Sequence, residues 1–124
     1  MPSAPGGNRQ VAVIQFGASS AELNGNDIAI LTRVAEIQRN NRGTVRIVAH
    51  ASQDTSGSSV VELARGNYDV SRRRALAVAT QLVRLGVPAN RIVAEAASDA
   101  EPAYEIHSAR GIAANRRAEI FVDF

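Results

Sequence analysis

The chain has 124 residues, which is enough for one domain with a buried core. Its 14 basic residues, all of them arginines, stand against 12 acidic residues, and the net charge of +2 is too small to indicate nucleic-acid binding. The sequence has no cysteine, which excludes disulfides and thiolate metal sites. No apolar run approaches the roughly 20 residues of a membrane-spanning helix.

The N-terminal residues 1–7 are mainly proline, glycine and other small residues. They contain no apolar stretch of the kind found in signal peptides. We therefore interpret residues 1–9 as a linker remnant of a longer protein and expect a single domain at residues 10–124.

The first half of the chain predicts a strand, a helix and a second strand. Residues 11–16 (VAVIQF) are β-branched and mostly apolar, as in a buried strand. After a polar loop, Asn24 is a candidate N-cap, and Asp27 follows at the spacing of a capping box. The apolar residues of the next segment share one helical face: Ile28, Leu31, Val34, Ala35 and Ile37. This helix is expected to end at residues 40–43 (NNRG), before a strand at residues 44–49.

The second half begins with a long connection of small and polar residues, 50–67, in which we assign at most one helical turn, at residues 60–64. A connection of this length in a compact domain is more often functional than idle. A second long helix is predicted to begin near Ser71 and to stop at Gly86, because glycine followed by valine and Pro88 is a helix-stop signature.

Two more strands complete the predicted fold. Residues 91–95 (RIVAE) and 118–124 (AEIFVDF) have strand patterns, and a polar excursion at residues 96–116 separates them. The order is therefore β-α-β-α-β-β, and strands joined through helices favour parallel pairing. The final strand makes the sheet mixed. The expected fold class is α/β (α+β), a mixed sheet with two long helices packed on one face.

Positive charge is concentrated at the predicted start of the second helix, in residues 71–74 (SRRR). If Ser71 caps this helix, three arginines lie in its first turn, where cations oppose the helix dipole. One interpretation is three solvated surface arginines. The other is that one of them, Arg74, binds a carboxylate with help from the first-turn N–H groups.

Residues 67–75 (NYDVSRRRA) resemble the N-x-x-L-S-x-x-R-A motif of the OmpA-like C-terminal domains. This family includes OmpA, the peptidoglycan-associated lipoprotein and the flagellar stator protein MotB. Further stretches match the family in the correct order, so that the resemblance covers nearly the whole chain: residues 14–16, 20–23, 46–50, 85–88, 91–92 and 115–120. The resemblance implies an OmpA-like fold.

The resemblance also implies a function, which is non-covalent binding of the peptide stem of peptidoglycan. In this family a diaminopimelate residue is held as a zwitterion. The motif arginine takes its carboxylate, and the aspartate of a G-H-T-D sequence takes its ammonium group. Carried over by position, the carboxylate side consists of Arg74, Asn67 and Arg116. We expect Arg74→Ala to abolish binding while leaving the fold intact.

This sequence departs from the family on the ammonium side. The G-H-T-D sequence is here residues 49–52 (AHAS), so Ser52 takes the position of the aspartate. A serine hydroxyl supplies no charge, and Asp54 is the candidate replacement. A second hypothesis therefore stays open, in which an OmpA-like scaffold has lost or altered its ligand binding and serves in protein interaction or dimerisation.

Other functions fit the residues less well. His50, Ser52 and Asp54 lie too close together on one strand end for a Ser-His-Asp triad, and no G-x-S-x-G sequence exists, so no enzyme is predicted. His50 and His107 lack a recognised metal spacing, and no metal or cofactor is expected. The few aromatic residues argue against nucleic acid.

The family resemblance implies a periplasmic or cell-envelope location, with a parent protein associated with the outer membrane. Any membrane attachment would come from missing parts of that parent. The expected partner is the peptidoglycan stem peptide, and a homodimer stays open.

Overall fold

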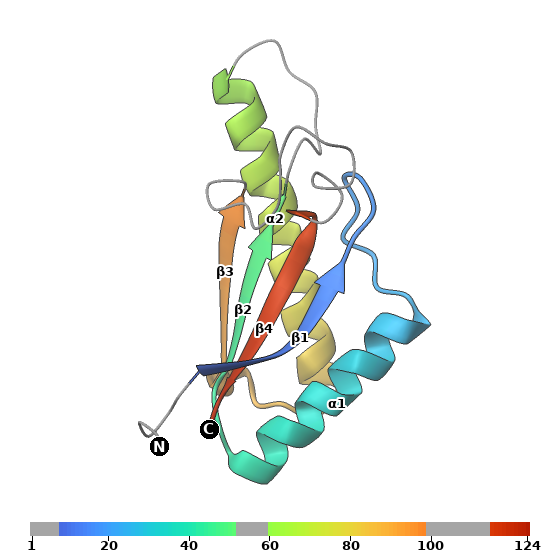
Figure 1. Cartoon of the computed structure of the whole chain (residues 1–124), viewed down its shortest axis with the longest axis vertical. Coiled ribbons are helices and arrows are strands. Elements are labelled where there is room, and N and C mark those ends of the chain that lie inside the picture. Colours follow the sequence, from blue (N-terminus) through green and yellow to red (C-terminus); the bar gives the residue numbers. More distant parts are fainter. Residues whose placement is uncertain (1–7, 52–59, 99–114) are drawn as a thin grey trace.

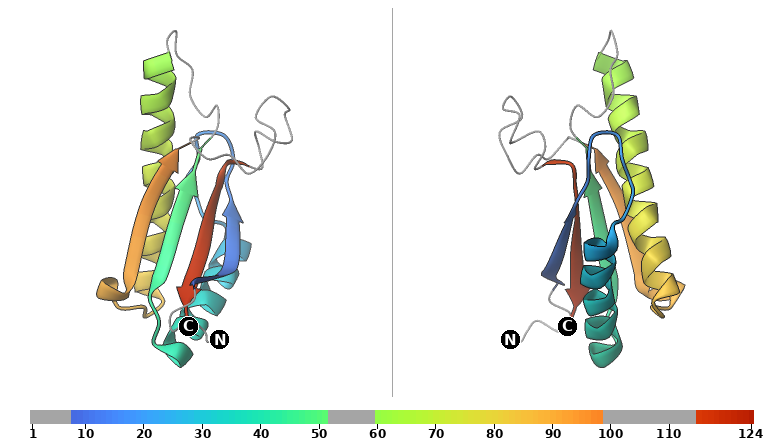
Figure 2. Two further views of the ribbon diagram at one scale, coloured as in Figure 1. Left: turned by 60° about the vertical axis from the view of Figure 1, so that its left-hand side comes forward. Right: turned by 90° about the vertical axis from the view of Figure 1, so that its right-hand side faces the viewer.

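The computed structural model describes residues 8–51, 60–98 and 115–124. These residues form a four-stranded sheet with the strand order β1-β4-β2-β3, and two α-helices cover one face of it (Figures 1 and 2). The elements in chain order are β1 Asn8–Gln15, α1 Gly25–Asn41, β2 Val45–His50, α2 Val60–Arg84, the short 3-10 helix η1 Ala89–Arg91, β3 Ile92–Ser98 and β4 Arg117–Asp123. The predicted mixed sheet with two long helices on one face is confirmed.

The sheet is mixed because its last strand, β4, lies in the middle and runs antiparallel to both of its neighbours. β2 and β3, which α2 connects, pair in parallel as predicted. β4 runs antiparallel to both β1 and β2 and lies between them, with Ile120 opposite Ala12 on one side and Ile47 on the other. β1 begins earlier than predicted, at Asn8.

The core lies between the sheet and the two helices. Alternate residues of β2 and β4 point toward the helices and are buried, which is the period of two that a strand imposes. The core is aliphatic apart from Phe16, as the low aromatic content requires. Its fully buried members include Ile14, Leu31, Val34, Ile47, Val78, Leu82, Ile120 and Val122. The intervening strand residues lie on the opposite face, where polar side chains can interact.

Helix α1 begins with the predicted capping box. Asn24 Oδ1 accepts a hydrogen bond from the Asp27 N–H at 2.8 Å, and Asp27 Oδ2 accepts one from the Asn24 N–H at 3.0 Å. At the other end, Arg42 takes the left-handed conformation with φ of 53°. Gly43, the next residue, allows a close approach of two main-chain segments, because a Cβ at this position would collide with the main-chain carbonyl of Asp123 in β4.

Helix α2 is much longer than predicted. It runs continuously from Val60, so the turn predicted before Ser71 and the helix predicted after it are one element. Gly66 and Asn67 do not break it, because a glycine in a helix costs only about 1 kcal/mol relative to alanine. Ser71 does not act as an N-cap; its Oγ donates to the carbonyl of Tyr68 at 2.9 Å, one turn earlier.

The continuity of α2 changes the interpretation of its arginines. Residues 72–74 lie in the helix interior, where each N–H bonds to the carbonyl four residues earlier. The free first-turn N–H groups and the positive end of the dipole, which were expected to help Arg74 bind an anion, do not occur at this position. That part of the prediction is wrong, and any anion binding by Arg74 depends on its side chain.

Helix α2 ends as predicted. Gly86 has φ of 103°, its N–H donates to Val83 O at 3.0 Å, and the Val87 N–H donates to Leu82 O at 3.0 Å. This pair of bonds is a Schellman motif. The turn returns the chain through η1 into the edge strand β3.

The N-terminal turns of α2 extend beyond the end of the sheet at which β2 and β3 terminate (Figure 1). The segment after β1 also reaches this end of the sheet (Figure 1). The residues that the family resemblance singled out therefore lie around one end of the molecule. Within the described ranges, neither helix combines the length and the apolar character needed to cross a membrane.

Candidate functional site

Arg74 is the largest fully buried side chain among the described residues, with 0% of its surface exposed. It projects from α2 toward the end of the sheet and donates three hydrogen bonds to main-chain carbonyls. Nε donates to Ser20 O at 2.8 Å, Nη1 to His50 O at 3.0 Å and Nη2 to Gly17 O at 2.9 Å. Its guanidinium carbon also lies 5.2 Å from the centroid of the Phe16 ring.

These contacts explain how a charge can be buried at this position. Removing a guanidinium from water costs several kcal/mol unless hydrogen bonds replace its hydration. The three carbonyls supply those bonds, and they come from the loop after β1 and from the end of β2. Arg74 therefore joins α2, β1 and β2 at the end of the sheet.

The burial of Arg74 revises one expectation. A fully buried side chain with three hydrogen bonds contributes to the fold, so Arg74→Ala is expected to lower stability in addition to any effect on binding. A binding assay on that variant alone cannot separate the two roles.

Arg116 lies at the same end of the sheet. The Phe16 N–H donates to the Arg116 carbonyl at 2.8 Å. This bond holds the Arg116 main chain beside Phe16, the residue whose ring lies under the Arg74 guanidinium. The Arg116 side chain is partly buried. Arg74 and Arg116 thus both contact Phe16, Arg74 over its ring and Arg116 through a main-chain hydrogen bond.

A second polar cluster lies on the sheet face away from the helices. His50 Nε2 is 3.1 Å from Glu119 Oε1, and Arg117 Nε is 3.4 Å from Glu119 Oε2. Arg117 Nη1 also donates to Asn115 Oδ1 at 2.9 Å. His50 and Arg117 are almost fully buried, and Glu119 supplies the carboxylate that both contact.

His50 connects this cluster to Arg74. Its side chain contacts Glu119, and its carbonyl accepts from the Arg74 guanidinium. His50 is therefore held at the end of β2 as part of the framework around the buried cation.

The remaining predicted site residues are Asn67, Ser52 and Asp54. Asn67 lies in α2, at a position seven residues before Arg74 and so on the same helical side, but its side chain is not among those described. Ser52 and Asp54 lie outside the described residues. Whether Asp54 faces Arg74 stays a prediction.

Sequence analysis missed several contributors to this site. The carbonyl acceptors of Gly17, Ser20 and His50 leave no signal in residue type, because every residue has a carbonyl group. Glu119 and Arg117 did have a signal, since their spacing of two on a strand places them on one face. That spacing, read together with His50 at the end of a neighbouring strand, would have predicted the cluster.

The fold and the buried cation define a small mixed-sheet module with a candidate binding site at one end of its sheet. The chain belongs to the OmpA family, whose family model matches residues 15–116. The predicted resemblance to OmpA-like domains is thereby confirmed. The domains of this family are non-enzymatic peptidoglycan-binding modules.

Three relatives illustrate the similarity. The probable lipoprotein YiaD of Escherichia coli (strain K12) is 33% identical over 107 residues, which are 86% of this chain and 46% of that protein. The cell wall anchor of the T6SS from Pseudomonas aeruginosa is 32% identical, with a TM-score of 0.72, over 90% of this chain and 78% of that chain. The peptidoglycan-associated lipoprotein from Burkholderia pseudomallei shares the fold at 20% identity, with a TM-score of 0.77, over 94% of this chain and 91% of that chain.

The chain spans less than half the length of the curated relatives it matches. Its relatives include outer membrane proteins, lipoproteins and periplasmic MotB domains.

Proposed function

We propose that this chain binds peptidoglycan non-covalently through the diaminopimelate-containing stem peptide and anchors an envelope protein to the cell wall. One observation carries the proposal. The arginine at the position of the family motif, Arg74, is a buried cation at the end of the sheet, and Arg116 is hydrogen-bonded to Phe16, whose ring lies under the Arg74 guanidinium. The similarity to the cell wall anchor of the T6SS from Pseudomonas aeruginosa supports the same function.

The carboxylate of the ligand is assigned to Arg74, Arg116 and Asn67. A carboxylate is a stronger acceptor for a guanidinium than a neutral carbonyl, because both partners are charged. It can therefore replace one of the main-chain acceptors of Arg74. The Gly17 and Ser20 carbonyls belong to the loop after β1, so a movement of that loop would release these two acceptors from Arg74.

The ammonium group of the ligand is assigned to Asp54, with Ser52 as a hydrogen-bonding neighbour. A carboxylate attracts an ammonium group far more strongly than a hydroxyl does. Asp54→Ala should therefore weaken binding more than Ser52→Ala. Equal binding by the wild type and both variants would show that neither Asp54 nor Ser52 binds the ammonium group.

Sedimentation with purified sacculi tests the function directly. The wild-type chain should sediment with the sacculi, and free diaminopimelate should release it. Arg116→Ala and Arg74→Lys should lower the bound fraction, since lysine keeps the charge but not the planar fork that pairs with a carboxylate. Arg72→Ala is the matched control, because Arg72 is an exposed neighbour on the same helix. Failure of the folded wild-type chain to sediment, or retention of full binding by both variants, would refute the proposal.

A second candidate function is a scaffold for protein interaction or dimerisation with lost or altered ligand binding. Two observations favour it. Arg74 already has three acceptors within its own chain, and Ser52 stands where the family has an acid. Sedimentation equilibrium measured alongside the sacculus assay separates the two functions, because the scaffold hypothesis expects a dimer or a partner complex without sacculus binding.

The location follows from the proposed function. A peptidoglycan anchor works in the periplasm, and we place the chain there as part of a larger envelope protein associated with the outer membrane. Any membrane attachment is assigned to other parts of that protein.

A further inference from the structure

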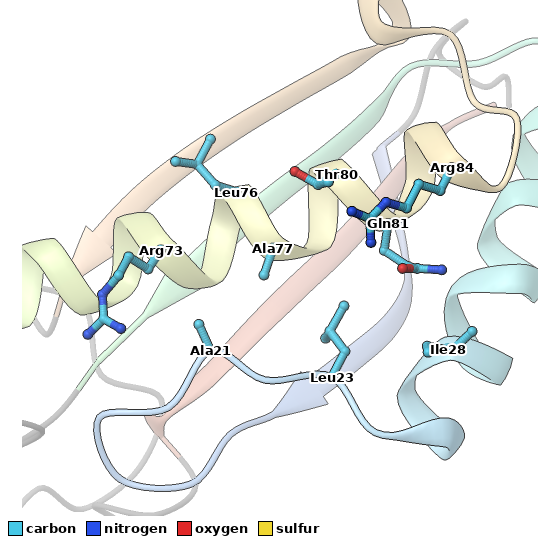
Figure 3. A pocket seen from close by; sticks show the side chains of 9 residues that line it. All are labelled: Ala21, Leu23, Ile28, Arg73, Leu76, Ala77, Thr80, Gln81 and Arg84. Carbon is cyan, nitrogen blue, oxygen red and sulfur yellow. The ribbon is translucent and has the colours of Figure 1, made fainter.

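A groove runs along α2, between this helix and the segment that leads from the loop after β1 into α1 (Figure 3). Its volume is about 490 Å³, within the range of roughly 300–1,000 Å³ that is typical of ligand sites. One wall is α2, and the other is the segment that leads from the loop after β1 into α1, including Leu23 and Ile28. The groove is therefore built by two segments far apart in sequence.

The groove is lined by apolar side chains together with Thr80 and Gln81. Ala77 points across it toward Leu23, and Leu76 stands at its rim (Figure 3). Leu76 is 47% exposed and Ile28 is 37% exposed, so large apolar side chains face solvent here. Burying such surface against a partner is favourable by about 25 cal/mol per Å².

Both ends of the groove are positive. Arg73 lies at one end and Arg84 at the other (Figure 3). The described residues that line the groove include these two arginines and no acid. Both guanidiniums are exposed, and neither has a hydrogen-bond or ion-pair partner within the described part of the chain. Their charges are therefore available to an external anion.

The two arginines have a fixed spacing. They lie on one face of α2, three turns apart, which is about 16 Å along the axis at a rise of roughly 1.5 Å per residue. An extended peptide advances about 3.3 Å per residue, so two carboxylates four to six residues apart would span the same distance. Apolar side chains between them would lie over Leu23, Leu76 and Ala77.

We propose that this groove is a docking site for an acidic peptide segment of a protein partner, in which apolar residues lie between two carboxylates that pair with Arg73 and Arg84. The alternation of positive charge, exposed apolar side chains and positive charge along α2 favours an acidic peptide, whose carboxylates and apolar residues would match both features. The inference does not rest on the proposed binding of peptidoglycan, because it uses other side chains and a different chemistry.

Selection from a random-peptide library displayed on phage tests the proposal. Peptides that bind the wild-type chain should be enriched in two acidic residues four to six positions apart with apolar residues between them. The most enriched peptide is then synthesised with a fluorophore, together with a version in which both acids are replaced by their amides. The amide version should bind at least about tenfold more weakly, as expected for loss of hydrogen bonds between charged groups.

Variants of the chain locate the binding site. Arg73→Glu and Arg84→Glu should each lower the affinity for the peptide at least about tenfold. Arg91→Glu should not lower it, because Arg91 is exposed and lies outside the groove. Ala77→Trp should block the groove, and Val83→Trp, an exposed position on the same helix that does not line it, should leave binding unchanged. All five positions are at least partly exposed, and circular dichroism checks that each variant is folded.

Several results would overturn the proposal. These are a selection that enriches no peptides, enriched peptides that bind equally well as amides, and binding that Arg73→Glu and Arg84→Glu leave unchanged. Preferential binding to anionic lipid vesicles, lost in the same two variants, would assign the groove to a membrane surface instead. Sacculus sedimentation by Arg84→Glu should equal that of the wild type, so the two proposals fail independently.

Discussion

The Arg74 guanidinium donates to the main-chain carbonyl of His50 at 3.0 Å, and this bond ties helix α2 to the end of strand β2. The same guanidinium binds two carbonyls of the loop after β1. An arginine that the family pattern assigns to a ligand is therefore also part of the framework of the protein. This double role determines which experiments can separate binding from folding.

The first prediction concerns the stability contribution of Arg74. Arg74→Ala should lower the free energy of unfolding by about 3–5 kcal/mol, because it removes three hydrogen bonds, leaves the buried His50 carbonyl without this donor and creates a cavity. Urea denaturation followed by circular dichroism measures this change. Arg72→Ala, on the exposed side of the same helix turn, should change stability by no more than about 0.5 kcal/mol. Equal effects of the two substitutions would contradict the buried role of Arg74.

The second prediction compares a largely buried charge cluster with a surface ion pair. Glu119→Gln removes the carboxylate that contacts His50 and Arg117, and Arg117 then stays buried with its charge less compensated. We expect a loss of about 2–3 kcal/mol.

Glu95→Gln is the control for that substitution, since Glu95 pairs with Arg46 at 2.8 Å with both side chains more than 40% exposed. An exposed pair contributes about 0–1 kcal/mol. The free energy of unfolding of both variants is measured by the same urea titration. A larger loss in the Glu95 variant would reverse our ranking of the two sites.

The third prediction uses two glycines with opposite surroundings. Gly43→Ala should destabilise the chain by about 1–3 kcal/mol, because the added Cβ would meet the carbonyl of Asp123 and push β4 away from the end of α1. Gly25→Ala should stabilise it by about 0.4–1 kcal/mol, since nothing lies within 4 Å of a Cβ there and the residue starts α1. Thermal unfolding of the two variants gives the sign of each change, and a stabilising Gly43→Ala would rule out the close approach.

The fourth prediction concerns the capping box of α1. Asn24→Ala should cost about 1 kcal/mol because it removes the side-chain acceptor for the Asp27 N–H. Asn24→Ser should restore most of the loss, since serine is also a good N-cap. Asn26→Ala, an exposed substitution in the same turn, provides the reference in chemical denaturation. Indistinguishable stabilities of the Asn24→Ala and Asn26→Ala variants would show that the cap contributes nothing.

Local patterns were predictable wherever a few neighbouring residues decide the conformation. The capping box at Asn24 and the helix stop at Gly86 involve contacts within six residues, so the sequence displays them directly. The order of elements followed from hydrophobic periodicity, and the family followed from motifs in the correct order. The start of α2 was predicted wrongly, because Gly66, Asn67 and Ser71 have low helix propensity, and the helix forms in spite of them.

The sequence by itself determined the family, the sequence of helices and strands, and the identity of the motif arginine. The tertiary structure decided that β4 lies between β1 and β2, that Arg74 is buried among main-chain carbonyls, and that His50, Glu119 and Arg117 form one cluster. It also decided that Arg73 and Arg84 stand at the two ends of an apolar groove, whose second wall comes from a distant segment. The physical reason is the range of the interactions. Helix caps and periodicity act over one or two turns, whereas burial, carbonyl acceptors and grooves depend on segments that only folding brings together.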